Sequence, residues 1–283
     1  MEKNAPTNTA LYEAISALLQ SEGITCFAAL PLSECRLTRP YLAERAGIPA
    51  QGSAVMMAVP YLCPEALTPD CNLSAYAVGR DYHLFFSGLF ARLCKQLSER
   101  FPDYRFAGFA DHSPIDERDA ACKAGLGVRG KNGLLLTTAY SSFVFLGELL
   151  TDAVLPGEAQ PIRTCIGCNR CLSACPITGT DRICLSALTQ KKGTPDEEET
   201  AQLRAHPLVW GCDICQTACP YTQNVIRRGT AFSTIPFFHE RLIPHLTVSL
   251  LDGMSDADFS ERAYAWRGRP TIRRNLLLKE EDK

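Results

Sequence analysis

Long apolar segments are missing from this chain of 283 residues. No uncharged stretch reaches the roughly 18 residues that a membrane-spanning helix requires, and the N-terminus shows neither the apolar core of a signal peptide nor a twin-arginine export signal. We therefore expect a cytoplasmic protein with no membrane partner. A large excess of one charge is missing too. The formal net charge is −2, which argues against non-specific coating of nucleic acid.

Local basic clusters remain. Each is either solvated surface, which is the more common case, or part of a phosphate-binding groove. These clusters are Arg227-Arg228, Lys191-Lys192, and the group Arg267, Arg269, Arg273 and Arg274.

Cysteine, by contrast, is abundant, with 14 residues. In a reducing compartment so many thiols indicate metal sites or free thiols rather than a disulfide framework. Two runs stand out by their spacing, and a proline follows the last cysteine of each. The runs are Cys165-Cys168-Cys171-Cys175 and Cys212-Cys215-Cys219.

Three cysteines separated by two residues can surround one 4Fe–4S cluster, and the cysteine before the proline then reaches a second cluster. The spacing predicts two clusters with crossed ligands, namely Cys165, Cys168 and Cys171 with Cys219, and Cys175 with Cys212 and Cys215. The second cluster lacks one ligand, and Cys184, between the runs, brings the total to eight. A tetrahedral zinc site is the alternative, but it explains neither eight cysteines nor both Cys-Pro endings.

The first 150 residues alternate between helical and extended patterns, as in an α+β fold with a mixed sheet. Apolar runs bounded by turn residues predict strands at 24–30, 53–61, 104–110, 134–137 and 142–150. Helical spacing predicts a helix that starts near Leu11 and is capped by Gly23, and two more at 81–100 and 115–124.

The pattern changes after Thr151, where a linker-like segment leads into short turns rich in cysteine. We therefore expect three parts. They are an α/β domain at 1–155, a cysteine-rich module at 156–230, and a C-terminal extension at 231–283 that packs back on the core.

Three polar stretches interrupt the first part. At 76–83, Asp81 and His83 stand at the start of a long helix, where both are either functional or ordinary helix residues, Asp81 as an N-cap. At 110–118, Asp111 follows an apolar strand, a position where α/β proteins place chemistry. The alternative is an N-cap for the next helix.

The third stretch, 125–132, contains the pattern GxGxxG. A helical pattern precedes it and an extended one follows, which is the reverse of a dinucleotide-binding motif. We therefore reject nicotinamide binding. Glycines also let the backbone approach a large planar cofactor closely.

Taken together, these stretches resemble the epoxyqueuosine reductases, cobalamin-dependent iron–sulfur enzymes of queuosine synthesis in tRNA. Both cysteine runs match, and Cys184 looks like the family's isolated cysteine, which supports it as the eighth ligand. The other matching segments are Gly79-x-Asp81-Tyr82-His83, Asp111-x-x-Pro114-x-x-Glu117-Arg118, Ala124-Gly125-Leu126-Gly127-x-x-Gly130-Lys131-Asn132, Phe145-Leu146-Gly147-Glu148-Leu149 and Cys184-Leu185-Ser186-Ala187-Leu188-Thr189.

The resemblance implies a cobalamin-binding catalytic domain at 1–155 and a ferredoxin-like module with two 4Fe–4S clusters at 156–230. In such enzymes the clusters pass electrons to cobalamin, which removes the epoxide oxygen from a modified wobble nucleoside of tRNA. We expect a monomer with an external low-potential electron donor. The implied cobalamin contacts are Tyr76, Asp81, Tyr82, His83, Asp111, Arg118, Gly130, Lys131, Asn132 and Ser186.

The resemblance also implies that Asp111 is the proton donor. It must then be protonated at neutral pH, although the reference pKa of an aspartate is about 3.9. Burial would favour the protonated form, and the nearby Arg118 would oppose it.

Two features depart from the family. Many members continue into a C-terminal helical-repeat domain associated with gripping the tRNA, and we expect a short form without it. After Thr189 the family usually has an apolar residue and a glutamate, where this chain has Gln190 and Lys191. Two alternatives stay open, namely a small-molecule reductase similar to reductive dehalogenases and a non-enzymatic electron carrier. The match around Asp111 favours the tRNA enzyme.

Overall fold

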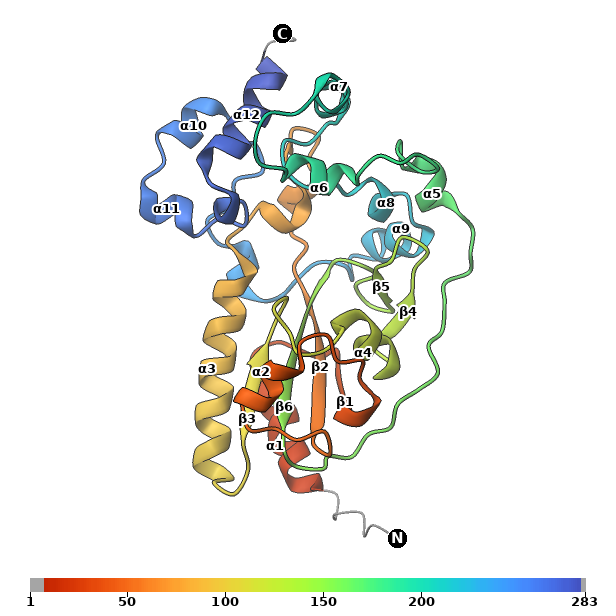
Figure 1. The fold of residues 1–283 in the computed structure, drawn as a ribbon, viewed down its shortest axis with the longest axis vertical. Helices are drawn as coiled ribbons and strands as arrows, with labels where there is room; N and C mark the ends of the chain where they lie inside the picture. Colours follow the sequence, from red (N-terminus) through yellow and green to blue (C-terminus); the bar gives the residue numbers. More distant parts are fainter. Residues whose placement is uncertain (1–7, 281–283) are drawn as a thin grey trace. The chain divides into compact units, whose positions relative to one another are not determined.

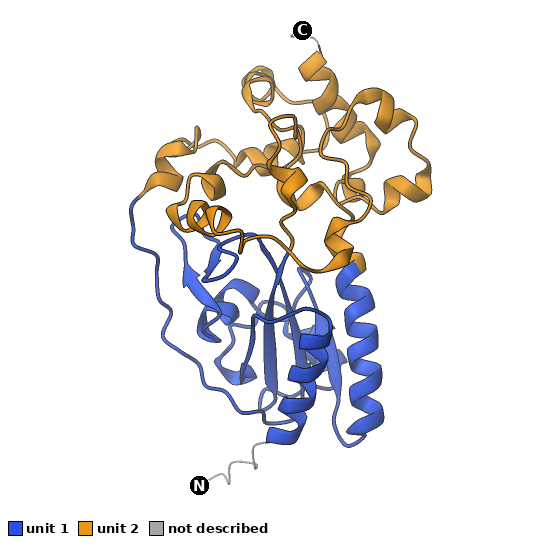
Figure 2. Cartoon of the chain, turned by 180° about the vertical axis from the view of Figure 1, so that it is seen from behind, with its two compact units in different colours: residues 1–60, 85–168 blue, residues 61–84, 169–283 orange. Residues whose placement is uncertain are grey.

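The computed structural model describes residues 8–280, which form two compact units (Figure 1, Figure 2). The first unit comprises the described residues up to Pro60 together with residues 85–168. The second comprises residues 61–84 and the described residues from Asn169 onward. The division into functional parts at 1–155, 156–230 and 231–283 stays a prediction.

A four-stranded sheet lies in the first unit. Its strands, in order across the sheet, are β1 (Phe27–Pro31), β2 (Ser53–Pro60), β6 (Val144–Thr151) and β3 (Phe106–Phe109). The three pairs are antiparallel. The α+β class is confirmed, but the expected mixed sheet is wrong. Strands β2 and β3 run in the same direction, yet β6 lies between them and runs opposite to both.

Helices pack against this sheet. Those of the first unit are α1 (Thr9–Ser21), α2 (Pro40–Arg45), most of α3 (Tyr82–Arg100), α4 (Glu117–Lys123) and the short 3-10 helix η1 (Leu32–Glu34). The side chain of Asn8 accepts the Leu11 N–H at 2.9 Å and so caps α1. Gly23, with φ 79°, follows the end of this helix as predicted.

Helices α3 and α4 lie on opposite faces of the sheet. A Cβ at Gly147 of β6 would lie 2.4 Å from the Phe86 ring of α3. The next residue, Glu148, points to the other face, where its register partner Met56 packs with Ala120 of α4. Glu148 therefore points into the apolar layer between α4 and the sheet.

A two-stranded hairpin follows α4. Strands β4 (Gly127–Arg129) and β5 (Leu135–Thr137) pair antiparallel. The glycine-rich stretch thus runs from a helix into a strand, as expected from the sequence. This order supports the rejection of a dinucleotide-binding motif.

The second unit consists of short helices joined by loops. Its core includes the fully buried side chains of Trp210 and Tyr264. The α-helices are α5 (Arg170–Ala174), α6 (Leu185–Thr189), α7 (Glu197–Ala205), α8 (Ile214–Thr217), α9 (Pro220–Arg227), α10 (Val248–Asp252), α11 (Asp256–Ser260) and α12 (Arg269–Glu280). The 3-10 helices are η2 (Pro64–Leu67), η3 (Ala75–Ala77), η4 (Pro236–His239) and η5 (Ala265–Arg267).

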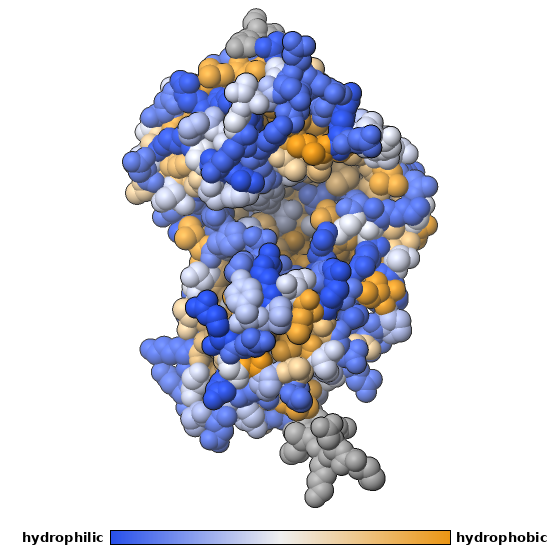
Figure 3. Space-filling view, viewed as in Figure 1, coloured by the Kyte–Doolittle hydropathy of each residue, from blue (hydrophilic) through white to orange (hydrophobic). Residues whose placement is uncertain are grey.

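Within residues 8–280, no helix is both long and apolar enough to cross a membrane. On the face drawn in Figure 3, hydrophobic residues are interspersed with hydrophilic ones.

Candidate functional site

Asp111 lies in the turn between β3 and α4, and its backbone has a left-handed φ of 63°. Its N–H donates a hydrogen bond to Oε1 of Glu117 at 2.9 Å. The N-cap of α4 is Asp116, whose side chain accepts the Asp119 N–H at 3.1 Å. The alternative reading of Asp111 as this cap is therefore wrong. A left-handed non-glycine residue costs about 1–3 kcal/mol and persists where surrounding contacts impose it, often at functional sites.

Two carboxyl groups meet beside this turn. Glu148 is 0% exposed, and its Oε1 accepts a hydrogen bond from the Ser113 hydroxyl. Glu117 is close enough to Glu148 for each carboxyl group to affect the pKa of the other. Burial raises the pKa of Glu117 to about 7 and raises the pKa of Glu148 well above its usual range. In the sequence, the signal for Glu148 is an acidic residue inside an apolar strand, and no local pattern pairs it with Glu117.

Arg118 was expected to act on Asp111. Its guanidinium donates to the Gly133 carbonyl at 3.1 Å, whereas Glu117 binds the Asp111 backbone. The negative charge of Glu117 therefore influences whether the Asp111 carboxyl group is protonated.

The glycine-rich stretch is shaped by this chain's own atoms. A Cβ at Gly127 would lie 2.4 Å from the carbonyl oxygen of Leu136, across the hairpin. A Cβ at Gly130 would lie 2.4 Å from Oδ1 of Asn132. The hairpin backbone itself therefore requires glycine at position 127, and the close approach of a planar cofactor is not needed to explain it. At position 130 the nearest atom belongs to a side chain that can move, so the hairpin alone does not require glycine there.

The first cysteine run begins beside this hairpin. The Cys165 N–H donates to the Arg129 carbonyl at 3.0 Å, and the Arg129 N–H donates to the Arg163 carbonyl at 2.8 Å. A Cβ at Gly167 would lie 3.9 Å from Cε of Lys131. The hairpin that carries three expected cobalamin contacts, Gly130, Lys131 and Asn132, thus also anchors the start of the first run.

A partly buried aspartate fixes the second run to η3. The Asp213 carboxylate accepts hydrogen bonds from the Ser74 hydroxyl at 2.6 Å and the Ala75 N–H at 2.7 Å. Its Oδ1 also accepts from the Gln216 side chain at 2.8 Å. The segment between Cys212 and Cys215 is therefore tied to residues 74–75.

Cys184 and two cysteines of the second run, Cys212 and Cys215, lie near one another in the second unit. Burial raises the pKa of the Cys212 thiol to about 12, and the charges of Asp213, Cys184 and Cys215 act in the same direction. Helix α5, which precedes Cys175, packs against α8. In the part of the chain that the structure describes, no three His, Cys, Asp or Glu side chains are arranged around a single ion. A cubane cluster, however, holds its four thiolates farther apart than one ion does.

Gly211 lets the second run pack against η3. It has φ 74°, and a Cβ there would lie 2.3 Å from Cβ of Ser74 and 2.9 Å from the Tyr76 ring. We expect Gly211→Ala to lower the free energy of unfolding by about 2 kcal/mol more than Gly193→Ala. Gly193 is the matched control, because it also has a positive φ, 85°, but no atom within 4 Å of an added Cβ. Anaerobic chemical denaturation measures both values, and equal losses would contradict this account.

Two expected cobalamin contacts share a partner in the second unit. The Gln190 amide donates to the Tyr76 hydroxyl at 3.4 Å and to the Ser186 hydroxyl at 3.2 Å. Gln190 is the position where the sequence departs from the family pattern. The departure therefore supplies a polar link between two expected contacts, a role that the sequence alone does not reveal.

Asp81 stands at the N-terminus of α3. Its Oδ1 accepts the His83 N–H at 3.0 Å and contacts His83 Nδ1 at 2.7 Å. The first of these bonds is the one that an N-cap makes, so this structural role of Asp81 is confirmed. It leaves the expected contact with cobalamin as a prediction.

A residue that contacts a large polar cofactor must be accessible from solvent in the cofactor-free protein. Asp111, Arg118, Lys131 and His83 are exposed, whereas Gly130 is buried. The partly exposed members are Tyr76, Asp81, Tyr82, Asn132 and Ser186. All of the set except Gly130 therefore fit the requirement that a bound ligand can reach them.

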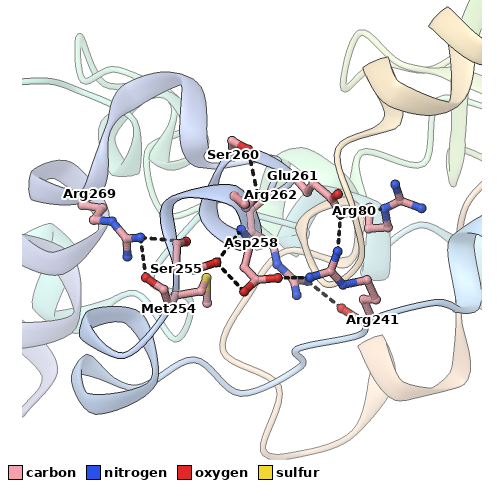
Figure 4. Close-up of polar contacts among 10 residues, drawn as sticks. Arg80, Arg241, Met254, Ser255, Asp258, Ser260, Glu261, Arg262 and Arg269 are labelled. Carbon is pink, nitrogen blue, oxygen red and sulfur yellow. Dashed lines mark hydrogen bonds and ion pairs between the residues drawn. The ribbon is translucent and has the colours of Figure 1, made fainter.

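The C-terminal arginines bind groups of this chain. Between α10 and α11, Arg269 donates to the carbonyls of Met254 and Ser255 (Figure 4). It also donates to the Leu251 carbonyl in α10. Arg273 forms an ion pair with Asp252 at 2.9 Å, and Arg274 donates to the Lys191 carbonyl at 2.8 Å. These contacts favour a structural role for this cluster over a phosphate-binding groove.

A second group of arginines in Figure 4 is also paired internally. Arg241 binds Asp258 and, at 2.5 Å, Glu261. Arg80 lies 3.1 Å from Glu261, and Arg262 donates to the Arg241 carbonyl at 2.6 Å. Acidic side chains and backbone carbonyls thus offset these positive charges.

The chain is similar in sequence to known epoxyqueuosine reductases. The family model described as "Epoxyqueuosine reductase QueG, DUF1730" matches residues 44–112. An epoxyqueuosine reductase of Gloeobacter violaceus is 33% identical over 236 residues, covering 80% of this chain and 73% of that protein. One from Listeria monocytogenes is 36% identical over 217 residues, covering 71% of this chain and 54% of that protein. The chain thus spans about three quarters of the first relative and about half of the second.

Solved structures show the same fold. The epoxyqueuosine reductase of Streptococcus thermophilus superimposes with a TM-score of 0.72 at 24% identity, covering 95% of this chain and 80% of that chain. An epoxyqueuosine reductase with an epoxyqueuosine-modified tRNA-Tyr stem loop superimposes with a TM-score of 0.74 at 23% identity, with the same coverage.

Proposed function

Because this chain belongs to the epoxyqueuosine reductase family, we propose that it reduces epoxyqueuosine to queuosine in tRNA. The observation that carries the proposal is the 33% identity to such a reductase over 80% of this chain. The tRNA stem loop held by the structurally similar reductase supports a tRNA with a modified wobble nucleoside as the substrate. We further propose that the protein acts in the cytoplasm as a monomer, with an external low-potential electron donor.

The proposed cofactors are two 4Fe–4S clusters and cobalamin. The closely placed thiols of Cys184, Cys212 and Cys215 support the second cluster. Spacing supports the remaining ligands, with Cys175 on the same cluster and Cys165, Cys168, Cys171 and Cys219 on the other. The proposed cobalamin contacts are Tyr76, Asp81, Tyr82, His83, Asp111, Arg118, Gly130, Lys131, Asn132 and Ser186.

The reaction consumes two electrons and two protons, forms an alkene from the epoxide and releases its oxygen as water. Clusters and cobalamin, when bound, would supply the electrons. The proton for the departing oxygen has to come from a protein acid or from water. Asp111 is the proposed donor, because its carboxyl is exposed on a strained turn.

The test is turnover of the natural substrate class. Protein purified without oxygen, with iron and cobalt quantified and a chemical reductant supplied, should convert epoxyqueuosine-tRNA to queuosine-tRNA. Nucleoside analysis by mass spectrometry measures the product. No conversion by protein with full iron and cobalt content would refute the proposed function.

A further inference from the structure

The turn of Asp111 depends on a carboxyl group that is itself partly buried. The left-handed backbone at Asp111 is held through its N–H, which donates to Oε1 of Glu117 at 2.9 Å. The next amide, that of His112, donates to the Ala110 carbonyl at 2.7 Å. Glu117 starts α4, which is capped by Asp116 and so fixed in place. The position of Asp111 therefore follows that of the Glu117 side chain.

Glu117 in turn rests on Glu148. Oε1 of Glu148 accepts from the Ser113 hydroxyl, while its buried Oε2 has no hydrogen-bond partner among the described residues. Two carboxylates have only acceptor atoms and cannot hydrogen-bond to each other. A proton on the buried Oε2 of Glu148 would let this oxygen donate to the neighbouring Glu117 carboxylate, and so would supply the partner that it lacks.

The surroundings favour that proton. Burial raises the pKa of both glutamates, more strongly that of Glu148. Asp111 and Asp116 act on Glu117 in the same direction through like-charge repulsion, and Glu148 and Lys123 both act electrostatically on the Cys35 thiol. The largest influences on the pKa of either glutamate include no cation, so a second negative charge on the pair is disfavoured.

We propose that Glu117 and Glu148 are positioning residues, which share one proton at neutral pH and hold the turn of Asp111 through its backbone N–H. In this arrangement Glu148 keeps the proton and donates to Glu117, whose other oxygen accepts the Asp111 N–H. The charge that remains on Glu117 repels an ionised Asp111. Because this repulsion is mutual, it favours the protonated Asp111 that the proposed function needs, and to that extent the inference rests on the proposed function.

Infrared spectroscopy tests the shared proton without substrate. At about pH 8 most exposed carboxyls are ionised, but Asp111 and the buried Asp213 can contribute bands of their own. The protonated carboxyl band of Glu148 is therefore read from the difference between the wild type and each variant. It should be present in the wild type and in the control Glu99→Gln, on the exposed side of α3, and absent in Glu148→Gln. Glutamine keeps the shape and donates to Glu117, so this variant should fold. A wild type without the band overturns the proposal, whatever its activity.

Hydrogen exchange tests the positioning, again without substrate. In Glu117→Gln the amide still accepts the Asp111 N–H and donates to Glu148, whereas Glu117→Ala loses both bonds. Peptides that contain Asp111 should exchange about 10-fold faster in Glu117→Ala and at the wild-type rate in Glu117→Gln. Equal exchange in Glu117→Ala and the wild type overturns the positioning role.

The pH profile of turnover separates this role from a merely structural one. At about pH 5.5 Glu117 is protonated, since burial raises its pKa to about 7, and Glu117→Gln is its neutral mimic with near-wild-type kcat. At about pH 8 the wild-type Glu117 is ionised and repels an ionised Asp111, whereas Glu117→Gln lacks this repulsion. The kcat of the variant should therefore be about 10-fold below that of the wild type. If the ratio of variant kcat to wild-type kcat is the same at both pH values, the proposed repulsion between Glu117 and Asp111 is wrong. The infrared band and the hydrogen exchange can behave as expected while the cofactor-loaded wild type leaves epoxyqueuosine-tRNA unchanged. In that case the proposed function is wrong, and the shared proton is still supported.

Discussion

Asp111→Asn is expected to lower kcat for epoxyqueuosine-tRNA by at least about 100-fold, because a positioned general acid contributes roughly that much to the rate. The asparagine amide cannot donate an acidic proton to the departing oxygen. Asparagine also tolerates a left-handed backbone about as well as aspartate does, so the turn with φ 63° is kept. Single-turnover assays on protein with matched iron and cobalt content measure the change.

The matched control for this variant is Asp103→Asn. Asp103 is exposed and lies just before β3 in the same unit, and its substitution should leave kcat unchanged. An Asp111→Asn protein that retains more than about a tenth of wild-type kcat contradicts the role of Asp111 as the acid.

Cys184→Ala is expected to reduce the iron content from about eight to about four per chain, because a cluster with three thiolates is lost or damaged. Turnover should then fall to background, since electrons lack one step of their path. The Cys184 side chain is exposed, so its removal leaves no cavity in the core. Iron analysis and electron paramagnetic resonance of the reduced protein measure the effect.

Cys94→Ala is the control for this experiment. Cys94 is a partly buried thiol in α3 and lies outside both cysteine runs, so its substitution should leave eight irons per chain. An unchanged iron content in Cys184→Ala would exclude this residue as the eighth ligand.

The sequence by itself determined the local features of this protein. The apolar runs at 53–61 and 142–150 became β2 and β6 within one or two residues at each end, and the helix at 81–100 became α3. The period of apolar residues along the chain reports such elements directly. The cysteine spacing is local as well, which is why a ligand set can be predicted from it before any fold is known.

Only the tertiary structure decided how these elements combine. Strand direction depends on which strands meet, so β6 between β2 and β3 made the sheet antiparallel. The structure also brought Glu148 of β6 to Glu117 of α4 and gave the cap of α4 to Asp116 rather than Asp111. Contacts between residues far apart in the chain leave no periodic pattern in it. The raised pKa values beside Asp111 arise from burial, and burial exists only once the chain has folded.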